Sequence, residues 1–250
     1  MAGDSTLFEA GTLVAFVLIF DTWERLSPGR KVDRRKHLKL DLLALLVVIV
    51  AGTFWKSLLL AGYEAADLSR FFTPLAPIHE LPSVLKVTIG LVVTDFALFL
   101  VHWSMHASDL LWRTHVFHHT IEELYWLSGA RTSVTHLFLF ALPQVLLAYG
   151  VFGLTAGEAA VAFSIGVIIN LWVHTNIRVN LGPLSKLIIT PDYHRIHHAA
   201  DSRCNTNYGF ILTVWDRLFR RFTDPRRTPD DFPLGLVDPE TDTPRLIIGV

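Results

Sequence analysis

Long apolar runs alternate with polar and charged segments along the 250 residues of the chain. Five of these runs approach the roughly 20 residues that a helix needs to cross a bilayer. They cover residues 7–23, 42–62, 84–102, 134–151 and 156–174. The pattern predicts an all-α fold, a polytopic helical membrane protein with about five spans.

Composition agrees with this fold class. Hydrophobic residues make up 51% of the chain and charged residues 18%, and the mean hydropathy is +0.40, which is too apolar for an ordinary soluble domain. The net charge of −1 gives no reason to expect a nucleic-acid partner. The single cysteine, Cys204, can form neither an internal disulfide nor a thiolate metal site, so a metal would depend on histidines and carboxylates.

The loops between the apolar runs differ in their basic residues. The segment between the first two runs is strongly basic. It carries Arg25, Arg30, Lys31, Arg34, Arg35, Lys36 and Lys39. By the positive-inside rule this segment is cytoplasmic. Alternate threading then places the end of the third run, the start of the fourth and the end of the fifth on the same cytoplasmic side.

Three regions follow from the same reading. Residues 1–83 hold the N-terminal spans and the basic loop, residues 84–222 form a histidine-rich catalytic membrane domain, and residues 223–250 are an extended C-terminal arm rich in proline and charge. The first run lacks a basic leading segment and a small-residue cleavage site, so we interpret it as a retained span. The protein is expected in a bacterial inner membrane or in the endoplasmic reticulum.

Most of the 12 histidines fall on the predicted cytoplasmic side. They are His102, His106, His115, His118, His119, His136, His174, His194, His197 and His198. Of the other two, His79 falls on the opposite side and His37 lies in the basic loop. So many imidazoles beside lipid would be costly to bury without a metal or protons to compensate. The sequence therefore predicts a histidine-rich helical cap with a metal site.

The spacing of these histidines suits metal ligation. "HWSMH" places two histidines four apart, and "HVFHH" and "HRIHH" both follow the spacing i, i+3, i+4, which on a helix gathers imidazoles on one face. The count exceeds what one ion can use, which indicates two metals, and iron fits better than the roughly three-ligand pattern of zinc hydrolases. The predicted ligands are His102, His106, His115, His118, His119, His174, His194, His197 and His198. His37 and His79 are interpreted as structural, and His136 is undecided.

With these motifs the chain resembles the fatty acid hydroxylase and sterol desaturase superfamily of integral-membrane di-iron enzymes. The likeness also includes "WVHTNIRVNLGPL" and "TPDYHRIHHAADSRCNTNYGFILTVWDRLF", and the latter part is similar to alkylglycerol monooxygenase, a pterin-dependent member. The chain departs from its relatives where Ser133 replaces the histidine of a His-Pro pair and where Ala107 replaces an acid. It also has basic residues in place of Gly-Thr, Arg220 and Arg221, which we interpret as facing lipid headgroups.

The resemblance implies an oxidoreductase that uses two iron ions, which purified protein can show as zinc, to hydroxylate or desaturate a sterol, fatty acyl or ether lipid with dioxygen. The chain carries no dinucleotide, haem or iron–sulfur motif, so an external redox partner is expected: a ferredoxin, a cytochrome or a pterin. Basic residues in segments 25–39 and 217–227 could dock an acidic carrier. The alternatives are a membrane zinc metallohydrolase and a metal transporter; apolar mid-span residues disfavour the transporter.

Several polar residues are candidates for supporting roles. Asp95, an intramembrane carboxylate, is expected either to orient a ligand histidine or to bond a neighbouring helix. Carboxylates next to the histidine motifs could accept the far N–H of a ligand: Glu122, Glu123 and Asp192. The predicted walls of the site are Asn176, Asn207 and Tyr208, and Arg131 and Arg195 are predicted to anchor a partner or a lipid headgroup.

Overall fold

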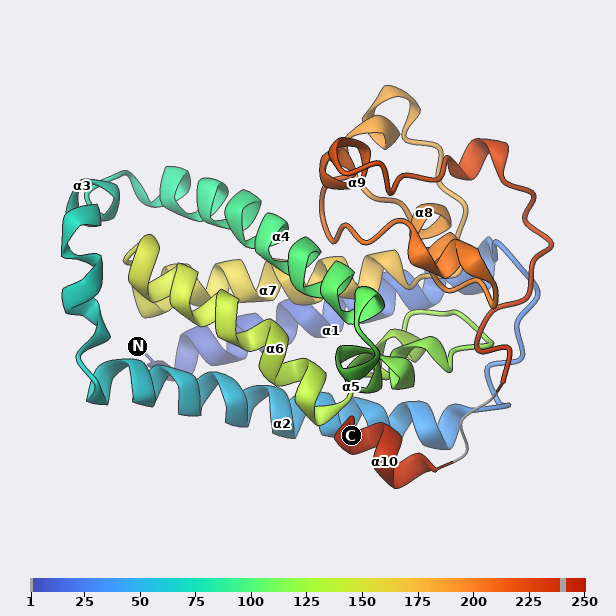
Figure 1. Ribbon diagram of the computed structural model, residues 1–250, viewed down its shortest axis with the longest axis horizontal. Helices are drawn as coiled ribbons and strands as arrows, with labels where there is room; N and C mark the ends of the chain where they lie inside the picture. The colour runs from blue at the N-terminus through green and yellow to red at the C-terminus, as the bar shows by residue number, and fades with distance from the viewer. Residues whose placement is uncertain (1, 239–241) are drawn as a thin grey trace.

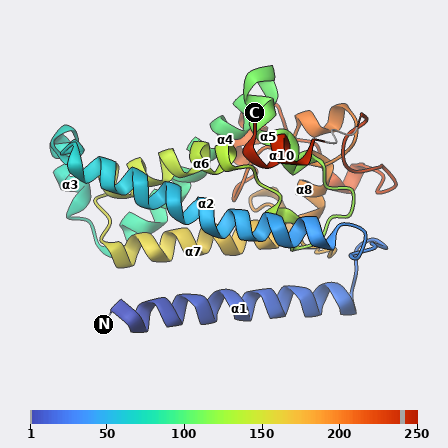
Figure 2. The same ribbon diagram turned by 90° about the horizontal axis from the view of Figure 1, so that it is seen from below.

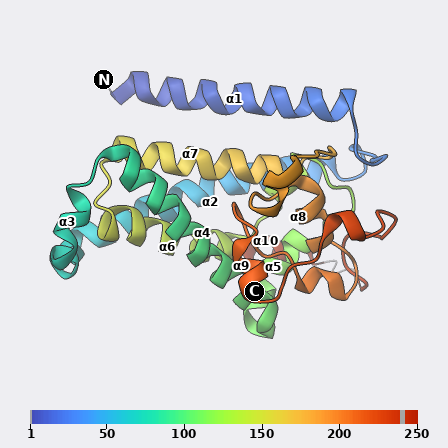
Figure 3. The same ribbon diagram turned by 90° about the horizontal axis from the view of Figure 1, so that it is seen from above.

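Long helices lying lengthwise beside one another dominate the computed structural model, which describes residues 2–238 and 242–250 (Figure 1). They are α1 (Ala2–Leu26), α2 (Leu38–Ala65), α4 (Ser83–Ala107), α6 (Val134–Val145), which continues as a π-helical turn over Leu146–Val151, and α7 (Ala156–Val173). Figures 2 and 3 show α1 as an outer layer. It meets α7 through Phe20 and Trp23, whose rings each lie 6.2 Å from the ring of Trp172.

Four of the helical segments are long and apolar enough to cross a membrane: Leu38–Ala65, Ser83–Ala107, Val134–Val151 and Ala156–Val173. These correspond to the second to fifth predicted spans, and the helical membrane fold is confirmed. The first predicted span, residues 7–23, lies within α1 but is not among these four. Its side chains up to residue 10 lie outside the described part of the chain.

The chain reverses direction between successive long helices. The basic segment 27–37, the end of α4, the start of α6 and the end of α7 therefore meet at one end of the bundle, the histidine end (Figure 1). The opposite end carries the 3-10 helix Leu68–Leu75 and α3 (Ala76–His79). There His79 Nε2 lies 3.0 Å from the carbonyl oxygen of Gly150, so His79 is far from the other histidines, as predicted.

Short helices close the histidine end, and we refer to them and their connecting loops as the cap. They are α5 (Asp109–His119), Ser128–Ala130, Gly182–Lys186, α8 (Pro191–His197), Ser202–Asn205, α9 (Val214–Leu218) and Pro225–Arg227. Thr190 and Pro191 determine where α8 begins. Thr190 accepts a hydrogen bond from the backbone N–H of Tyr193, and Pro191 occupies the first turn, where its missing N–H costs nothing.

The C-terminal segment differs from the extended arm that its prolines and charges predict. It ends in a short helix, α10 (Thr243–Ile248), whose Leu246 is buried with Ala44, Phe117 and Ala130. Gly249, with φ of +84°, ends this helix in the left-handed conformation that glycine adopts most readily. The apolar run "LII" is too short to show a helical period, so the sequence pattern missed it. Residues 239–241 lie outside the described residues.

Buried ion pairs attach the basic loop and α2 to the cap. Asp41, fully buried in the first turn of α2, accepts hydrogen bonds from Arg131 Nε at 2.6 Å and from Tyr125 Oη at 2.7 Å. Glu24 at the end of α1 accepts from Arg34 at 2.7 Å and from the backbone N–H of Asn176 at 2.7 Å. Because a buried charge must be paired, these contacts fix the cap relative to the helices.

Candidate metal centre

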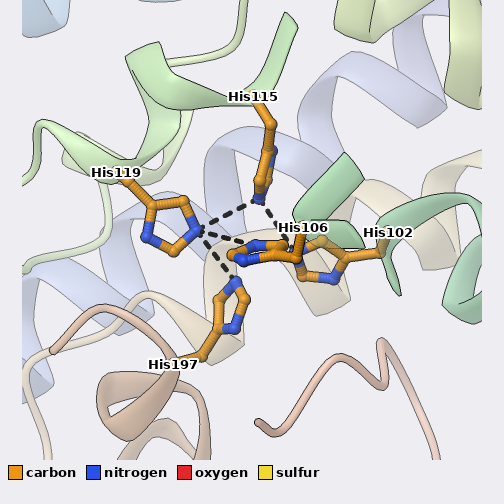
Figure 4. Close-up of side chains that lie close together, drawn as sticks. All are labelled: His102, His106, His115, His119 and His197. Carbon is orange, nitrogen blue, oxygen red and sulfur yellow. Dashed lines mark hydrogen bonds between the residues drawn. The ribbon is translucent and has the colours of Figure 1, made fainter. Parts of the chain in front are cut away.

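Nine histidines at the histidine end form two groups. In the first group, which we name the five-histidine group, one ring nitrogen from each residue lies within 4.8 Å of those of the others. Its members are His102, His106, His115, His119 and His197. Figure 4 shows their imidazoles converging from α4, α5 and α8. The second group, the four-histidine group, satisfies the same distance and consists of His118, His174, His194 and His198.

The sequence spacing explains how the two groups come to lie side by side. In "HVFHH" the residues four apart, His115 and His119, belong to the five-histidine group, and His118 belongs to the other. In "HRIHH" the assignment is reversed, because His194 and His198 join the four-histidine group. Each of these two motifs therefore contributes to both groups, whereas both histidines of "HWSMH" belong to the five-histidine group. The rings of His119 and His198, one from each group, are stacked with centroids 5.0 Å apart.

Backbone carbonyl oxygens set the tautomers of four of these imidazoles. Their Nδ1 atoms lie 2.7–3.0 Å from carbonyl oxygens: His102 from Tyr208, His118 from Arg131, His174 from Asn170 and His197 from Thr206. A carbonyl oxygen can only accept, so each Nδ1 carries the proton. The Nε2 of each neutral ring therefore keeps its lone pair.

These Nε2 atoms face one another. His118 Nε2 and His174 Nε2 lie 3.2 Å apart, and in both rings the proton is on Nδ1, so two lone pairs face each other. His119 Nε2 lies 3.1–3.2 Å from three other Nε2 atoms, those of His106, His115 and His197. One nitrogen cannot share a proton with three neighbours. Cations between the rings would satisfy these lone pairs, so the donor set fits bound metal.

Burial favours the neutral form that ligation requires. The pKa values of His118, His119 and His197 are lowered well below the usual value by burial and further by neighbouring histidines. Burial lowers the pKa of His174 to about 4. Because a neutral imidazole is the metal-binding form, protons do not compete for these rings near neutral pH.

Comparison with known proteins identifies the family. The model of the fatty acid hydroxylase family matches residues 87–221, more than half of the chain, and contains all nine histidines. The chain belongs to the fatty acid hydroxylase family. The resemblance seen in the sequence is thereby confirmed, and membership makes this chain a lipid-oxidising oxidoreductase and an integral membrane protein.

The chain is similar to three relatives, and the matched region covers a different share of each. The chain is 29% identical over 235 residues to ornithine lipid hydroxylase OlsE of Rhizobium tropici, covering 88% of this chain and 68% of that protein. It is 30% identical to human alkylglycerol monooxygenase over 51% of this chain and 28% of that protein. Delta(7)-sterol 5(6)-desaturase erg3A of Aspergillus fumigatus is 28% identical over 68% of this chain and 47% of that protein. No solved structure matches the chain significantly.

His136, undecided from the sequence, lies beside the five-histidine group but is not one of its members. Its Nδ1 lies 3.2 Å from the Nδ1 of His115, whose Nε2 faces His102 Nε2 at 2.9 Å. Ser133, at the position of the missing histidine, caps α6 by accepting from the backbone N–H of His136. His136 is therefore placed to orient His115 and not to join the group directly.

Of the two roles predicted for Asp95, the structure supports the hydrogen bond to a neighbouring helix, here α9, and not direct contact with a ligand histidine. Asp95 accepts hydrogen bonds from the backbone N–H groups of Ile211 and Leu212, at 2.7 and 3.0 Å, and from Trp215 Nε1 at 2.8 Å. Asp216 binds the same loop from the other side, through the N–H groups of Tyr208 and Gly209 at 2.8 and 2.7 Å. The two buried carboxylates hold the loop whose Tyr208 carbonyl orients His102.

The predicted acidic partners of the ligand histidines were wrong. Glu122 pairs with Lys36, Glu123 accepts from the backbone N–H of Asp33, and Asp192 pairs with Arg195. Backbone carbonyls take the expected role for four of the ligand histidines: His102, His118, His174 and His197. The side-chain pattern of the sequence carries no signal for these carbonyls, so they were missed.

The three residues predicted to form the walls of the site have separate roles. The Tyr208 ring lies 5.0 Å from that of His106, so Tyr208 does line the five-histidine group. Asn207, at φ of +62°, is buried and its amide donates to the carbonyl groups of Tyr193 and Thr223. Asn176 and Arg30 exchange backbone and side-chain hydrogen bonds at 2.8–3.0 Å. Asn207 and Asn176 therefore support the loops around the centre.

The two arginines predicted as anchors, Arg131 and Arg195, are both buried. Each has only 1% of its surface exposed. Arg131 pairs with Asp41, and Arg195 with Asp192 at 2.6 Å. Burial on this scale keeps Arg131 and Arg195 from anchoring either a partner or a lipid headgroup, so the predicted role is replaced by a structural one.

Proposed function

We propose that this protein is a di-iron lipid hydroxylase and that the nine histidines of the two groups are its ligands. The observation that carries the proposal is the pair of adjacent all-histidine groups whose Nε2 lone pairs converge at one end of a membrane helix bundle. When bound, a reduced iron pair supplies the activation of dioxygen that oxidation of an unactivated C–H bond requires. Imidazole is a suitable ligand for iron.

The chain itself has three tasks in this reaction. The histidines bind the ions, and the carbonyls of Tyr208, Arg131 and Thr206 hold the rings in the ligating tautomer. Buried side chains exclude water, since eight of the nine histidines are buried. Only His106 is partly exposed, and it therefore marks the side on which substrate and dioxygen approach.

The proposed substrate is a membrane lipid that bears a polar headgroup. The support is the similarity to the ornithine lipid hydroxylase, which extends over 88% of this chain and 68% of that protein. Hydroxylation is favoured over desaturation because two of the three relatives described above are named as a hydroxylase or a monooxygenase. An ornithine lipid is the first substrate to test, and alkylglycerol and sterol are the next.

Electrons are proposed to come from an external carrier on the cytoplasmic side. The basic segment between α1 and α2 lies at the histidine end, where Lys31, Arg35 and Lys39 are exposed. The positive-inside rule assigns that end to the cytoplasm. The same exposed cations would attract an acidic ferredoxin or cytochrome; a reduced pterin is the other candidate donor.

Heavy-isotope dioxygen tests the reaction. Purified protein loaded with iron, in lipid nanodiscs with a reductant and ornithine lipid, is expected to place one labelled oxygen atom in the product, measured by mass spectrometry. A product that has lost two hydrogens and gained no label would show desaturation. Turnover that continues without dioxygen and reductant would contradict an oxygenase and favour the zinc hydrolase. The all-histidine groups, which include no carboxylate among the described residues, disfavour that alternative.

His136 provides a prediction about positioning. Substitution of His136→Ala removes the acceptor of His115 Nδ1–H, so the affinity of the five-histidine group for iron should fall about 10-fold. His136→Asn places an amide oxygen near the position of the lost Nδ1 and should retain most of the affinity. Iron titration followed by absorbance measures both. Equal losses in the two variants would mean that His136 acts by packing against Phe140, whose ring centroid is 4.4 Å away.

A further inference from the structure

Several large apolar side chains of the cap are exposed at its surface. Leu184, Leu187 and Ile188 are 54%, 56% and 39% exposed, and Val214 and Leu218 of α9 are 37% and 68% exposed. Single exposed apolar residues are ordinary, but a contiguous set indicates a surface that contacts something apolar.

These residues form one surface because their two segments pair through the backbone. The N–H of Thr213 donates to the carbonyl of Leu187 at 2.9 Å, and the N–H of Ile189 donates to the carbonyl of Ile211 at 3.0 Å. Val214 follows directly on this pairing, and α9 extends it to Leu218. We name residues 184–188 together with α9 the apolar flap.

The apolar flap lies beside the membrane-spanning part of α4 and not above it. Asp95 binds the N–H groups of Ile211 and Leu212, and the ring of Phe96 lies 4.7 Å from that of Trp215. Asp95 comes seven residues before His102, which places it about 10 Å deeper along the helix axis. The loop and α9 therefore extend back along α4 toward the bilayer interior; Figure 1 shows α9 alongside the second half of α4.

The surroundings of the apolar flap match a leaflet of the bilayer. On α4, Val92 and Leu100, each within four residues of Phe96, are each 40% exposed. The flap itself carries the exposed Lys186 and Arg217, and the exposed Arg220 follows it. Long basic side chains next to exposed apolar ones are typical of elements that lie in a membrane interface, because the apolar side chains enter the acyl region while the charged ends reach the phosphate groups.

We propose that the apolar flap is embedded in the leaflet at the histidine end, with Leu187, Val214 and Leu218 among the acyl chains and Lys186 and Arg217 at the phosphates. The occupant of this surface is phospholipid. The proposal is independent of the reaction, since it rests on the packing of the flap against α4 and not on the metal centre.

Fluorescence quenching at single cysteines tests the placement. In a Cys204→Ser background, Leu187→Cys and Leu218→Cys are labelled with an environment-sensitive dye and reconstituted into phosphatidylcholine and phosphatidylglycerol nanodiscs. Both sites are highly exposed, so neither substitution should disturb folding. Quenchers attached to acyl chains should reduce the fluorescence of both labels several-fold more than dissolved iodide does.

Two matched sites calibrate the measurement. Leu46→Cys, on the exposed face of α2 at 57% exposure, should behave as the lipid-facing reference, and Val237→Cys, at 76% exposure in the C-terminal segment, should respond to iodide alone. Quenching of Leu187 and Leu218 by iodide, as for Val237, would overturn the proposal. Protection from both quenchers would also overturn it, because the flap would then be covered by protein, such as a second copy of the chain.

The unmodified protein gives a second readout. In nanodiscs that contain a lipid with a photoreactive diazirine on its acyl chain, crosslinked lipid should be recovered by mass spectrometry on peptides that contain residues 184–188 and 214–218. Recovery on the spans but not on these two segments would contradict the embedded placement.

Discussion

Replacing His118 or His197 with alanine is expected to abolish activity, with rates falling below about one per cent of the parent because even loss of a partner outside the metal ligands costs about 10–100-fold. The Nε2 of His118 faces His174 at 3.2 Å in the four-histidine group, and that of His197 faces His119 at 3.1 Å in the five-histidine group. Each variant removes a ligand from a different group. Iron bound per chain, measured by elemental analysis, should fall in both.

Control variants distinguish ligation from a general effect of removing imidazole. His37 lies in the basic loop, with its Nε2 3.6 Å from Glu122, and His79 lies at the far end of the bundle. His37→Ala and His79→Ala should therefore keep both iron content and turnover. Full activity with two irons per chain in His118→Ala protein would exclude the proposed ligand set.

The convergence of the histidines could be predicted from the sequence because two simple rules determine it. Alternating spans must reverse direction, and the basic segment 25–39 marks one side, so the sequence predicts that four separate stretches lie at one end. The structure confirms this shared end (Figure 1). The spacing i, i+3, i+4 also indicated gathered imidazoles. The spacing could not show that the i+3 histidine of each motif joins a different group from the i and i+4 histidines. The division into groups depends on where α5 and α8 meet.

Contacts that involve backbone groups or distant loops could not be predicted. The carbonyls that orient His102 and His118 belong to Tyr208 and Arg131, and side-chain identity does not determine where a carbonyl points. The acids next to the motifs were chosen by proximity in sequence, yet basic residues of the cap and of the loop before α2 pair with Glu122 and Asp192. Asp95 was correctly singled out as an intramembrane carboxylate, but its partners lie 116 to 120 residues later in the chain.

The second large effect is expected from removing the carboxylate of Asp95. Asp95→Ala should destabilise the protein by about 3 kcal/mol or more, because the N–H groups of Ile211 and Leu212 and the indole of Trp215 lose their acceptor, and each unsatisfied buried donor costs about 1–3 kcal/mol. The loop they anchor carries Tyr208, whose carbonyl orients His102. Loss of iron should therefore begin in the five-histidine group, and turnover should fall about 10–100-fold.

Asp95→Asn and Glu80→Ala are the comparisons that make this prediction specific. Asparagine keeps one acceptor oxygen, so it can still bind Leu212 and Trp215 while its amide group faces the N–H of Ile211; the losses should be intermediate. Glu80 is exposed at the opposite end of the bundle, and its replacement should leave melting temperature, iron content and rate unchanged. If Asp95→Ala melts and binds iron like the parent, the loop does not depend on Asp95. If it melts lower but keeps the full iron affinity of the five-histidine group, the loop contributes stability without orienting His102.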